Sequence, residues 1–440
     1  MGRPTKTKRL GVWMNGELAG SWTITPTGDH VFAYDPAWPH SKFARPISIS
    51  MPLRPSDAPY RGPSVEAFFD NLIPDSIEIR KRFQNRFGTP TAQAFDLLAE
   101  MGRDCVGALQ LAPAGKAPEK VTSVQSNPLS DSKIAEALRG AASPSILGQT
   151  DPDDFRISLA GAQEKTAFLK YKGKWHRPKG ATPTSHIFKL PMGNRIGKHQ
   201  IDMSTSVENE WLCGKIVSAF GIPIAPSELA VFEDQRVLIV QRFDRQWSKD
   251  KSWLMRLPQE DMCQALGVPM GWKYESEGAP GISDILKFLL GSRQSVLDRR
   301  TFLKAQVLFW MLAATDGHAR NFSIFIGRGG GFNLTPLYDV LSAFPFLGHG
   351  KNRLAPEQAK MAMAVKSRSK HYLWERINRT HWMVMARASG LDKMIGDILS
   401  ELIDTAAATA DMVAATLPAD FPSSVSETIL TGLKKSARGA

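Results

Sequence analysis

The chain has 440 residues, of which 42% are hydrophobic and 22% are charged. Both proportions are ordinary for folded globular proteins, so they exclude extensive disorder. No segment approaches the roughly eighteen uninterrupted apolar residues of a membrane span, and no apolar signal core follows the basic start MGRPTKTKRL. We therefore expect a cytoplasmic protein that does not associate with a membrane.

Charge and cysteine usage narrow the class further. Fifty-five Lys and Arg against forty-three Asp and Glu give a formal net charge of +12, which favours polyanionic partners such as nucleic acids or nucleotides. The three cysteines, Cys105, Cys213 and Cys263, lie far apart and form no CxxC pair. A disulfide framework or a zinc site is therefore not expected.

The first 150 residues are expected to form strands, then helices, then a connecting segment. GVWMNGELAGSWTIT alternates and turns at Asn15-Gly16, a pattern typical of a β-hairpin. Helices follow at about 64–87, interrupted by Pro74, and at about 91–101. Residues 111–150 are rich in Ala, Pro, Ser and Gly, which predicts a linker with one short helical candidate, SDSKIAEALRG.

The next hundred residues are again mainly strand-like. FRISL, TAFLKY, HIFKLP and VLIV have strand patterns. Residues 206–220 are expected to form an amphipathic helix, and Thr205 with Glu208 fits a capping box at its start. After Trp253 the pattern is mostly helical, apart from a strand pair around GRGGG.

These patterns predict an α+β protein with a β-rich N-terminal domain and a mostly helical C-terminal lobe. The expected division is an N-terminal domain at 1–110, a linker at 111–150, a nucleotide-binding lobe at 151–250 and a helical catalytic lobe at 251–440.

The strongest functional signal is the segment TDGHARNFSIFIGRGGGFNLTPLYD. Asp316 and Asn321 have the D-x4-N spacing of a kinase catalytic loop, and a hairpin then returns the chain to Asp339. Phosphoryl transfer needs a carboxylate that accepts the proton of the attacking hydroxyl, and oxygen ligands for magnesium. Asp316 could supply the first, and Asn321 with Asp339 the second. Ordinary capping and turn roles for the three residues remain an alternative.

Three weaker signals precede this segment. Lys189 is a single cation at the end of the apolar strand HIFKLP, and Glu210 on the next helix is a candidate partner, as in the Lys–Glu pair of kinases. The small residues of SLAGAQEKT would let backbone N–H groups approach phosphate. In VQRFDRQW, Gln241 to Phe243 would cross between lobes beside adenine, and Asp244 could reach a ribose hydroxyl. Each signal also has an ordinary structural interpretation, but their order along the chain is the order that a kinase needs.

The chain also resembles the HipA family of toxin kinases along nearly its whole length. The resemblance rests on the segments FFDNLIPDS, FDLLAEMGRDCVGAL, DFRISLAGAQEKTA, HIFKLP, RFDRQW, LPQEDMCQALG, ATDGHARNFSIFI, LYDVLSAFP and LPADFP. It implies a two-lobed, ATP- and magnesium-dependent serine/threonine kinase. Family toxins phosphorylate an aminoacyl-tRNA synthetase, glutamyl-tRNA synthetase in the best-known branch, and so arrest translation and growth and produce persister cells. The resemblance also implies a helix-turn-helix antitoxin like HipB, which holds the toxin at operator DNA as a co-repressor.

Carried over residue by residue, the resemblance implies a catalytic Asp316, magnesium ligands Asn321 and Asp339, and an autophosphorylated Ser158. The residues expected to bind ATP are Leu159, Ala160, Gly161, Ala162, Gln163, Lys189, Gln241, Phe243, Asp244 and His318. Two positions depart from the family pattern, since Gln241 stands where Glu is expected and Arg320 where Lys is common. Gln259-Glu260-Asp261 receives no role.

The sequence also permits two rival functions and predicts one DNA-contacting surface. The chain could be a pseudokinase that acts only as a co-repressor, or a hydrolase that binds a metal through Asp316, His318 and Asp339. A basic segment of the helical lobe is expected to contact DNA phosphates weakly, while the antitoxin reads the bases. Its residues are Lys366, Arg368, Lys370, Arg376, Arg379 and Arg387, of which Lys366, Arg368, Lys370 and Arg387 are the expected contacts.

Overall fold

The computed structural model describes residues 7–55, 57–142, 163–194, 201–269 and 271–438. The chain divides into two compact units. The first unit holds residues 1–190, 231–272 and 324–332, and the second holds residues 191–230, 273–323 and 333–440. Sheets and helices are both abundant, so the predicted α+β class is confirmed. Within the described residues no helix is both long and apolar enough to cross a membrane.

A five-stranded antiparallel sheet opens the first unit, in the order β4-β3-β2-β1-β5. Its strands are β1 (Lys8–Met14), β2 (Glu17–Ile24), β3 (His30–Tyr34), β4 (Tyr60–Arg61) and β5 (Leu109–Pro113). The predicted hairpin is confirmed. Asn15 and Gly16 connect β1 to β2 with φ of 48° and 90°, and positive φ at both positions suits the right-handed twist of paired strands.

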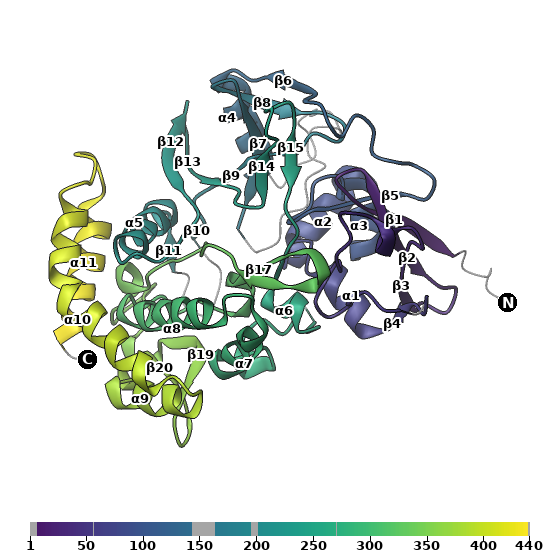
Figure 1. The fold of residues 1–440 in the computed structure, drawn as a ribbon. Coiled ribbons are helices and arrows are strands. Elements are labelled where there is room, and N and C mark those ends of the chain that lie inside the picture. The colour runs from purple at the N-terminus through teal and green to yellow at the C-terminus, as the bar shows by residue number, and fades with distance from the viewer. Residues whose placement is uncertain (1–6, 56, 143–162, 195–200, 270, 439–440) are drawn as a thin grey trace. The chain divides into compact units, whose positions relative to one another are not determined.

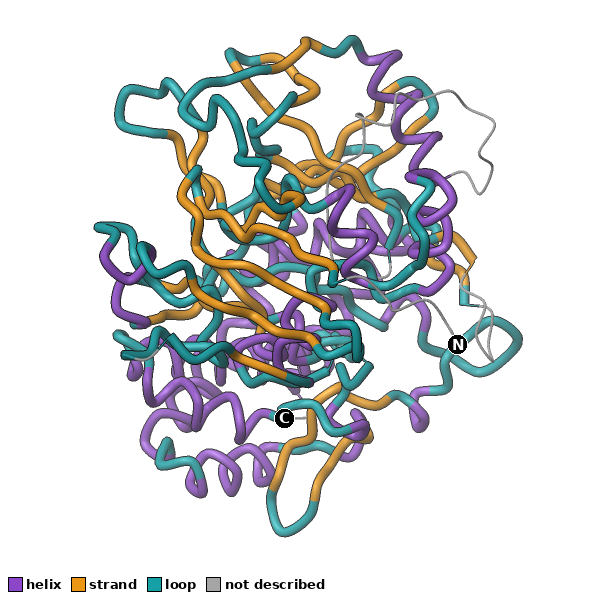
Figure 2. The backbone as a smooth tube through the Cα atoms, turned by 90° about the vertical axis from the view of Figure 1, so that its right-hand side faces the viewer, coloured by secondary structure: helices purple, strands orange, loops and turns teal. Residues whose placement is uncertain are grey.

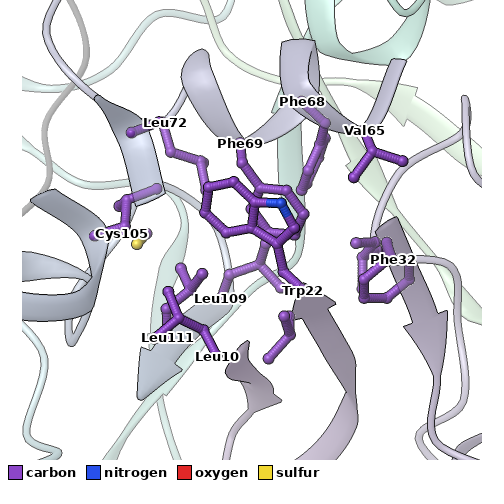
Figure 3. Close-up of a cluster of buried hydrophobic side chains, with 14 of the residues drawn as sticks. Leu10, Trp22, Phe32, Val65, Phe68, Phe69, Leu72, Cys105, Leu109 and Leu111 are labelled. Atoms are coloured by element: carbon purple, nitrogen blue, oxygen red, sulfur yellow. The ribbon is translucent and has the colours of Figure 1, made fainter. Parts of the chain in front are cut away.

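Three helices cover one face of this sheet and close a hydrophobic core around Trp22. They are α1 (Pro63–Asp70), α2 (Ile77–Phe87) and α3 (Ala94–Met101). Trp22 is fully buried and stacks on Phe69 of α1, with ring centroids 4.1 Å apart. Figure 3 shows Trp22 among Phe69, Leu72 and Leu109, which come from separate elements. The predicted break at Pro74 is confirmed, since it lies between α1 and α2.

The second sheet of the chain has six strands in the order β12-β13-β9-β7-β8-β6. They are β6 (Ser126–Pro128), β7 (Lys165–Tyr171), β8 (Lys174–Pro178), β9 (His186–Lys189), β12 (Ser227–Phe232) and β13 (Gln235–Gln241). Helix α4 (Asp131–Ala142) packs against β7 and β13. Much of the expected linker 111–150 is therefore part of a folded layer, because Ile134 and Leu138 of α4 are fully buried.

Short elements complete the strand-rich part of the chain. They are β10 (Gly193–Asn194), β11 (Asp202–Met203), β14 (Arg245–Trp247), β15 (Leu254–Arg256), β16 (Gln259–Asp261), β17 (Ser323–Ile326), β18 (Phe332–Leu334) and α6 (Met262–Ala265). The strand pair expected around GRGGG corresponds to β17 and β18, which form a three-stranded sheet with β16.

The second unit is a helical assembly. Its helices are α5 (Ser206–Ala219), α7 (Ile282–Phe288), α8 (Ser295–Met311), α9 (Arg379–Ala388), α10 (Asp392–Ala414) and α11 (Ser423–Arg438). Helix α10 packs on α5, α8, α9 and α11. A hairpin of β19 (Lys360–Lys366) and β20 (Lys370–Leu373), which the sequence did not indicate, extends from these helices (Figures 1 and 2).

The start of α5 and the division of the chain into units both differ from the expectations. The capping box at Thr205 is wrong: this residue has φ −99° and ψ 18° rather than an extended backbone, and its side chain makes no capping hydrogen bond to the described helix. The two units also do not coincide with the expected domains, because residues 191–230 group with the helical part. The boundaries expected from the sequence stay a prediction.

Candidate functional site

The loop that carries Asp316 and Asn321 follows the buried end of α8. Nine consecutive residues from Phe302 to Trp310 are buried, and Gly317 passes directly over this helix. A Cβ atom at Gly317 would lie 2.5 Å from Cδ2 of Phe309, which no ordinary contact allows. The close approach explains the glycine in the motif and fixes the backbone on which Asp316 stands.

Asp316 is the exposed carboxylate of this loop. Its Oδ1 accepts a hydrogen bond of 2.7 Å from the phenol of Tyr274. Its main-chain oxygen accepts from the N–H of His318 at 2.8 Å. An exposed carboxylate whose direction is fixed by a neighbour is suited to meet an incoming hydroxyl group.

His318 and Asn321 are buried and have polar atoms without hydrogen-bond partners among the described residues. These atoms are Nδ1 of His318 and Oδ1 of Asn321. Burial lowers the pKa of His318 below its ordinary value, so the imidazole is favoured in its neutral form. Because buried polar atoms are nearly always satisfied in folded proteins, these two atoms are candidates for contact with water or a bound molecule.

Asp339 faces Asn321. The Asn321 amide Nδ2 lies 3.4 Å from both the main-chain oxygen and Oδ2 of Asp339. Asp339 has φ of 60°, a left-handed conformation that side-chain-bearing residues rarely adopt and that concentrates at functional sites.

The segments on both sides of Asp339 are anchored within the second unit. Ser342 exchanges hydrogen bonds with the side chain of Asn209 on α5, at 2.8 and 2.9 Å. The hydroxyl of Tyr338 donates to the main-chain oxygen of Arg320 at 2.8 Å. The Asp339 segment and the Asp316 loop are therefore held to one frame.

The donors at this site suit magnesium. Oδ1 of Asn321 has no described partner, and Asp339 adds carboxylate oxygens beside it; oxygen donors of this kind bind Mg²⁺, which takes its remaining ligands from substrate phosphates and water. The hydrolase alternative is less well supported. Among the described residues, no three or more His, Cys, Asp and Glu side chains form a metal-binding group, so Asp316, His318 and Asp339 do not.

Lys189 and Glu210 are both buried, at 7% and 6% exposure. Lys189 ends β9, opposite Leu238 of β13 and Lys165 of β7, and Glu210 lies on α5. They belong to different units, so their pairing stays a prediction. A lysine buried at the end of a central strand nevertheless fits the expected phosphate contact better than a lysine that extends into solvent.

Of the residues expected to contact the nucleoside, Gln241 ends β13, and Phe243 and Asp244 follow the strand. Gln241 is exposed and lies opposite His186, while the Phe243 ring packs edge-on against Phe325 at 5.7 Å. Asp244 is different. It is 4% exposed, and its oxygens accept from the Arg242 guanidinium and from the N–H of Gly107. With both oxygens engaged inside the protein, the ribose contact of Asp244 has little structural support and stays untested.

Asp244 is one member of a buried charge network that the sequence did not indicate. Asp104 accepts hydrogen bonds from Arg245 at 2.9 Å and from Arg256 at 3.1 Å, and forms an ion pair with Arg242 at 3.4 Å. Burial alone would raise the pKa of Asp104, but the three guanidinium groups outweigh it and lower this pKa. We name these five residues, Asp104, Arg242, Asp244, Arg245 and Arg256, the Asp104 network.

The LPQEDMCQ motif also has identifiable contacts. The Asp261 carboxylate and Gln264 form a capping box at the start of α6. Glu260 is fully buried, and its Oε1 accepts a 2.7 Å hydrogen bond from the N–H of Ile49. Burial raises the pKa of Glu260 to about 8. Glu260 therefore joins β16 to the loop at 47–51, whereas Asp261 caps α6, all within the first unit.

Part of the expected phosphate loop lies outside the described residues. These positions are Ser158, Leu159, Ala160, Gly161 and Ala162. Gln163 is described and buried, and its side-chain amide donates to the main-chain oxygen of Leu190 at 2.7 Å. One N–H of this amide is therefore engaged, which leaves its second N–H and the backbone N–H for a phosphate contact.

In the basic segment, only one of the expected DNA contacts has a described ion-pair partner. Lys370 lies 2.8 Å from the buried carboxylate of Glu275, which raises the pKa of this lysine. Lys366, Arg368 and Arg387 are exposed. DNA contact stays a prediction for all four residues, and Lys370 is the one whose charge is already matched.

Fold and loop together define an α+β protein with an exposed aspartate beside a buried amide and a carboxylate. Comparison with known families matches residues 10–112 to the HipA N-terminal domain and residues 157–410 to the HipA-like C-terminal domain. The C-terminal match alone covers more than half of the chain, so this protein belongs to the HipA family.

Individual relatives agree with this assignment. A candidate kinase of Sinorhizobium fredii, called Y4mE, is 31% identical over 416 residues, covering 93% of this chain and 91% of its own. The serine/threonine-protein kinase toxin HipA of Shewanella oneidensis is 26% identical over 352 residues, covering 77% and 75%. A solved complex of Shewanella oneidensis HipA, HipB and operator DNA has a chain that shares the fold, with a TM-score of 0.79 at 20% identity over 98% of this chain and 96% of that one.

Proposed function

We propose that this protein is an ATP- and magnesium-dependent serine/threonine kinase and the toxin of a type II toxin–antitoxin pair. The observation that carries the proposal is the arrangement in the second unit. Asp316 is exposed and oriented, and the unpartnered Oδ1 of Asn321 lies in a buried side chain beside Asp339. The names of the relatives, which are kinases or candidate kinases, support the same activity.

In this mechanism Asp316 orients the attacking hydroxyl and accepts its proton. The hydroxyl oxygen forms a bond to the γ-phosphorus, the bond to the β–γ bridging oxygen breaks, and ADP leaves. Asn321 and Asp339 would hold Mg²⁺, which supplies positive charge to the phosphate oxygens. Lys189, paired with Glu210, would contact the α- and β-phosphates. Backbone groups of residues 159–163, Gln241 and Phe243 would contact the rest of the nucleotide, and His318 would lie beside it.

The proposed substrate is an aminoacyl-tRNA synthetase in the cytoplasm, glutamyl-tRNA synthetase first among them. Its phosphorylation would arrest translation and growth and give drug-tolerant persister cells. Autophosphorylation at Ser158 would switch the kinase off, because a phosphate carrying roughly two negative charges competes with ATP for the same donors. Ser158→Ala removes the acceptor hydroxyl, so this variant should lack the autophosphorylated band seen by gel electrophoresis of the wild type.

The proposed partner is a helix-turn-helix antitoxin like HipB, through which the protein would act as co-repressor at operator DNA. The fold shared with the HipA chain of a HipA–HipB–operator complex supports this partnership. A pseudokinase that acts only as co-repressor is the alternative function.

A transfer assay with ATP, Mg²⁺ and glutamyl-tRNA synthetase tests the proposal. Asp316→Gln should bind Mg-ATP within a few-fold of wild type and transfer phosphate on the order of a hundredfold more slowly, the scale of general-base catalysis. Asp404→Asn, which changes an exposed aspartate of α10, is the matched control and should transfer normally. Phosphate transfer by Asp316→Gln at the wild-type rate would show that this residue is not the base. Absence of transfer from the wild type would favour the pseudokinase.

A further inference from the structure

Tyr274 lies 42 positions before Asp316, yet its phenol is the group that contacts the proposed base. The phenol donates to Oδ1 of Asp316 at 2.7 Å, and the ring lies edge-on to His318 with centroids 5.5 Å apart. A carboxylate has two oxygens, so a neighbour that holds one of them fixes the direction of the other. The contact therefore determines which oxygen of Asp316 is presented to a substrate.

The backbone of Tyr274 is itself held in place. Its main-chain oxygen accepts from the N–H groups of Glu277 at 2.9 Å and Ala279 at 3.1 Å. These bonds form the short 3-10 turn Glu275–Glu277 that directly follows Tyr274. A tyrosine on a bonded turn loses little further entropy when it orients a partner, since only its two side-chain torsions are still to be fixed.

The next residue, Glu275, ties this turn to the β19–β20 hairpin. Its buried carboxylate accepts from the N–H of Ala364 at 2.7 Å and from Lys370 at 2.8 Å. Gly281 leaves the space that this carboxylate needs, because a Cβ there would lie 2.4 Å from Cδ of Glu275. The turn that carries Tyr274 is thus anchored on two sides within the second unit.

We propose that Tyr274 is a positioning residue: its phenol holds Oδ1 of Asp316 and leaves Oδ2 for the substrate hydroxyl. The inference rests on the proposed kinase function. A hydrogen bond to an ionised group is among the stronger ones, so its loss should be visible in the rate. Tyr274 acts through Asp316 and touches no reacting atom, which predicts an effect on kcat and not on nucleotide affinity.

Tyr274→Phe is the decisive variant, because it keeps the ring against His318 and removes only the phenol oxygen. The assay measures phosphate transfer from radiolabelled ATP to glutamyl-tRNA synthetase, the substrate of the assay above, with Mg-ATP affinity and thermal unfolding measured in parallel. We expect kcat to fall roughly tenfold or more, with KM for ATP and Tm essentially unchanged. In an Asp316→Gln background the same substitution should cause no further loss of rate, because the carboxylate that the phenol orients is absent.

Tyr372→Phe is the matched control, since Tyr372 lies on β20 and the phenol that bonds Asp316 is that of Tyr274. It should leave kcat unchanged. A wild-type kcat in Tyr274→Phe, an increase in kcat, or a fall that follows a lower Tm or a raised KM for ATP would each overturn the positioning role. Absence of transfer from the wild type would instead overturn the kinase proposal on which it rests.

Discussion

The Asp104 network of the first unit and the Asp316 site of the second unit, made up of Asp316, His318, Asn321 and Asp339, treat buried polar groups in opposite ways. In the network, three arginines and two aspartates are at least 92% buried, and their remaining donors reach main-chain oxygens such as those of Cys105 and Gly107. At the Asp316 site, polar atoms of His318 and Asn321 are buried without described partners, and Asp339 has a left-handed backbone. The first arrangement is complete by itself, whereas the second keeps polar atoms that have no partner among the described residues.

This difference separates charges that stabilise the fold from charges kept for chemistry. Buried ion networks are sensitive to the loss of one member, because the remaining charges are then uncompensated. Sites for phosphoryl transfer instead keep oxygen atoms directed at a group that arrives later. The comparison predicts large stability effects with small effects on chemistry in the first region, and the reverse in the second.

Asp104→Asn should give the largest loss of stability. It leaves the guanidinium groups of Arg242, Arg245 and Arg256 buried with one carboxylate between them, which costs about 3–5 kcal/mol in comparable buried pairs. Urea unfolding followed by circular dichroism measures the change. Glu136→Gln, at an exposed position of α4 in the same unit, is the control and should change stability by less than about 0.5 kcal/mol. A loss below about 1 kcal/mol for Asp104→Asn would show that the network is not a stabilising unit.

Glu260 tests whether a carboxylate of the first unit without a cation partner stays neutral. Its folded pKa of about 8 lies above its ordinary value of 4.5, because burial disfavours the charge. The unfolded chain therefore releases this proton more readily, and wild-type stability should fall as pH rises from about 4.5 to about 8. Glu260→Gln should remove that part of the pH dependence and be the more stable protein at pH 8, on the order of a few kcal/mol. Parallel pH–stability curves for the two proteins would contradict this interpretation.

Asp339→Asn should have the opposite profile. Asparagine tolerates the left-handed backbone but lacks the negative charge proposed to hold Mg²⁺, so transfer should fall on the order of a hundredfold, while the free energy of unfolding changes by less than about 1 kcal/mol. Steady-state transfer rates and urea unfolding, compared with Asp404→Asn, give the two numbers. An equal loss in stability would make Asp339 a structural residue like Asp104.

Local features of the fold could be predicted from the sequence, whereas long-range polar contacts could not. The Asn15-Gly16 hairpin and the break at Pro74 depend on backbone preferences of the residues themselves. The partners of Asp104 are about 140 to 150 positions away, and no local pattern links them, although the three closely spaced charges in RFDR could have indicated a buried ion network. Tyr274 was missed for the same reason, because a hydrogen bond across 42 positions leaves no periodicity.

The Asp316 segment was the most predictable part of the site because its chemistry needs a fixed local order of residue types. Even so, the sequence could not show which atoms of Asn321 and His318 lack partners, since this depends on burial by α8 and its neighbours. Thr205 illustrates the converse, where residue types matched a capping box but the backbone conformation did not.

The smallest expected effect concerns the β19–β20 hairpin, in which one cationic side chain forms an ion pair and two have none with the described residues. Lys370 is ion-paired with Glu275, whereas Lys366 and Arg368 are exposed and have no ion pair with the residues that the structure describes. If this hairpin meets DNA phosphates in the antitoxin complex, each lost contact lowers the salt slope of operator binding by about one. Lys366→Met with Arg368→Gln should therefore lower the slope by about two, while Lys370→Met should leave it nearly unchanged and phosphate transfer should persist in both.

A salt titration of the two-protein complex on operator DNA measures this slope. Equal slopes in the wild type and the double variant would show that the hairpin does not contact DNA, and a lower slope in Lys370→Met would show that its pairing with Glu275 does not keep it from the phosphates.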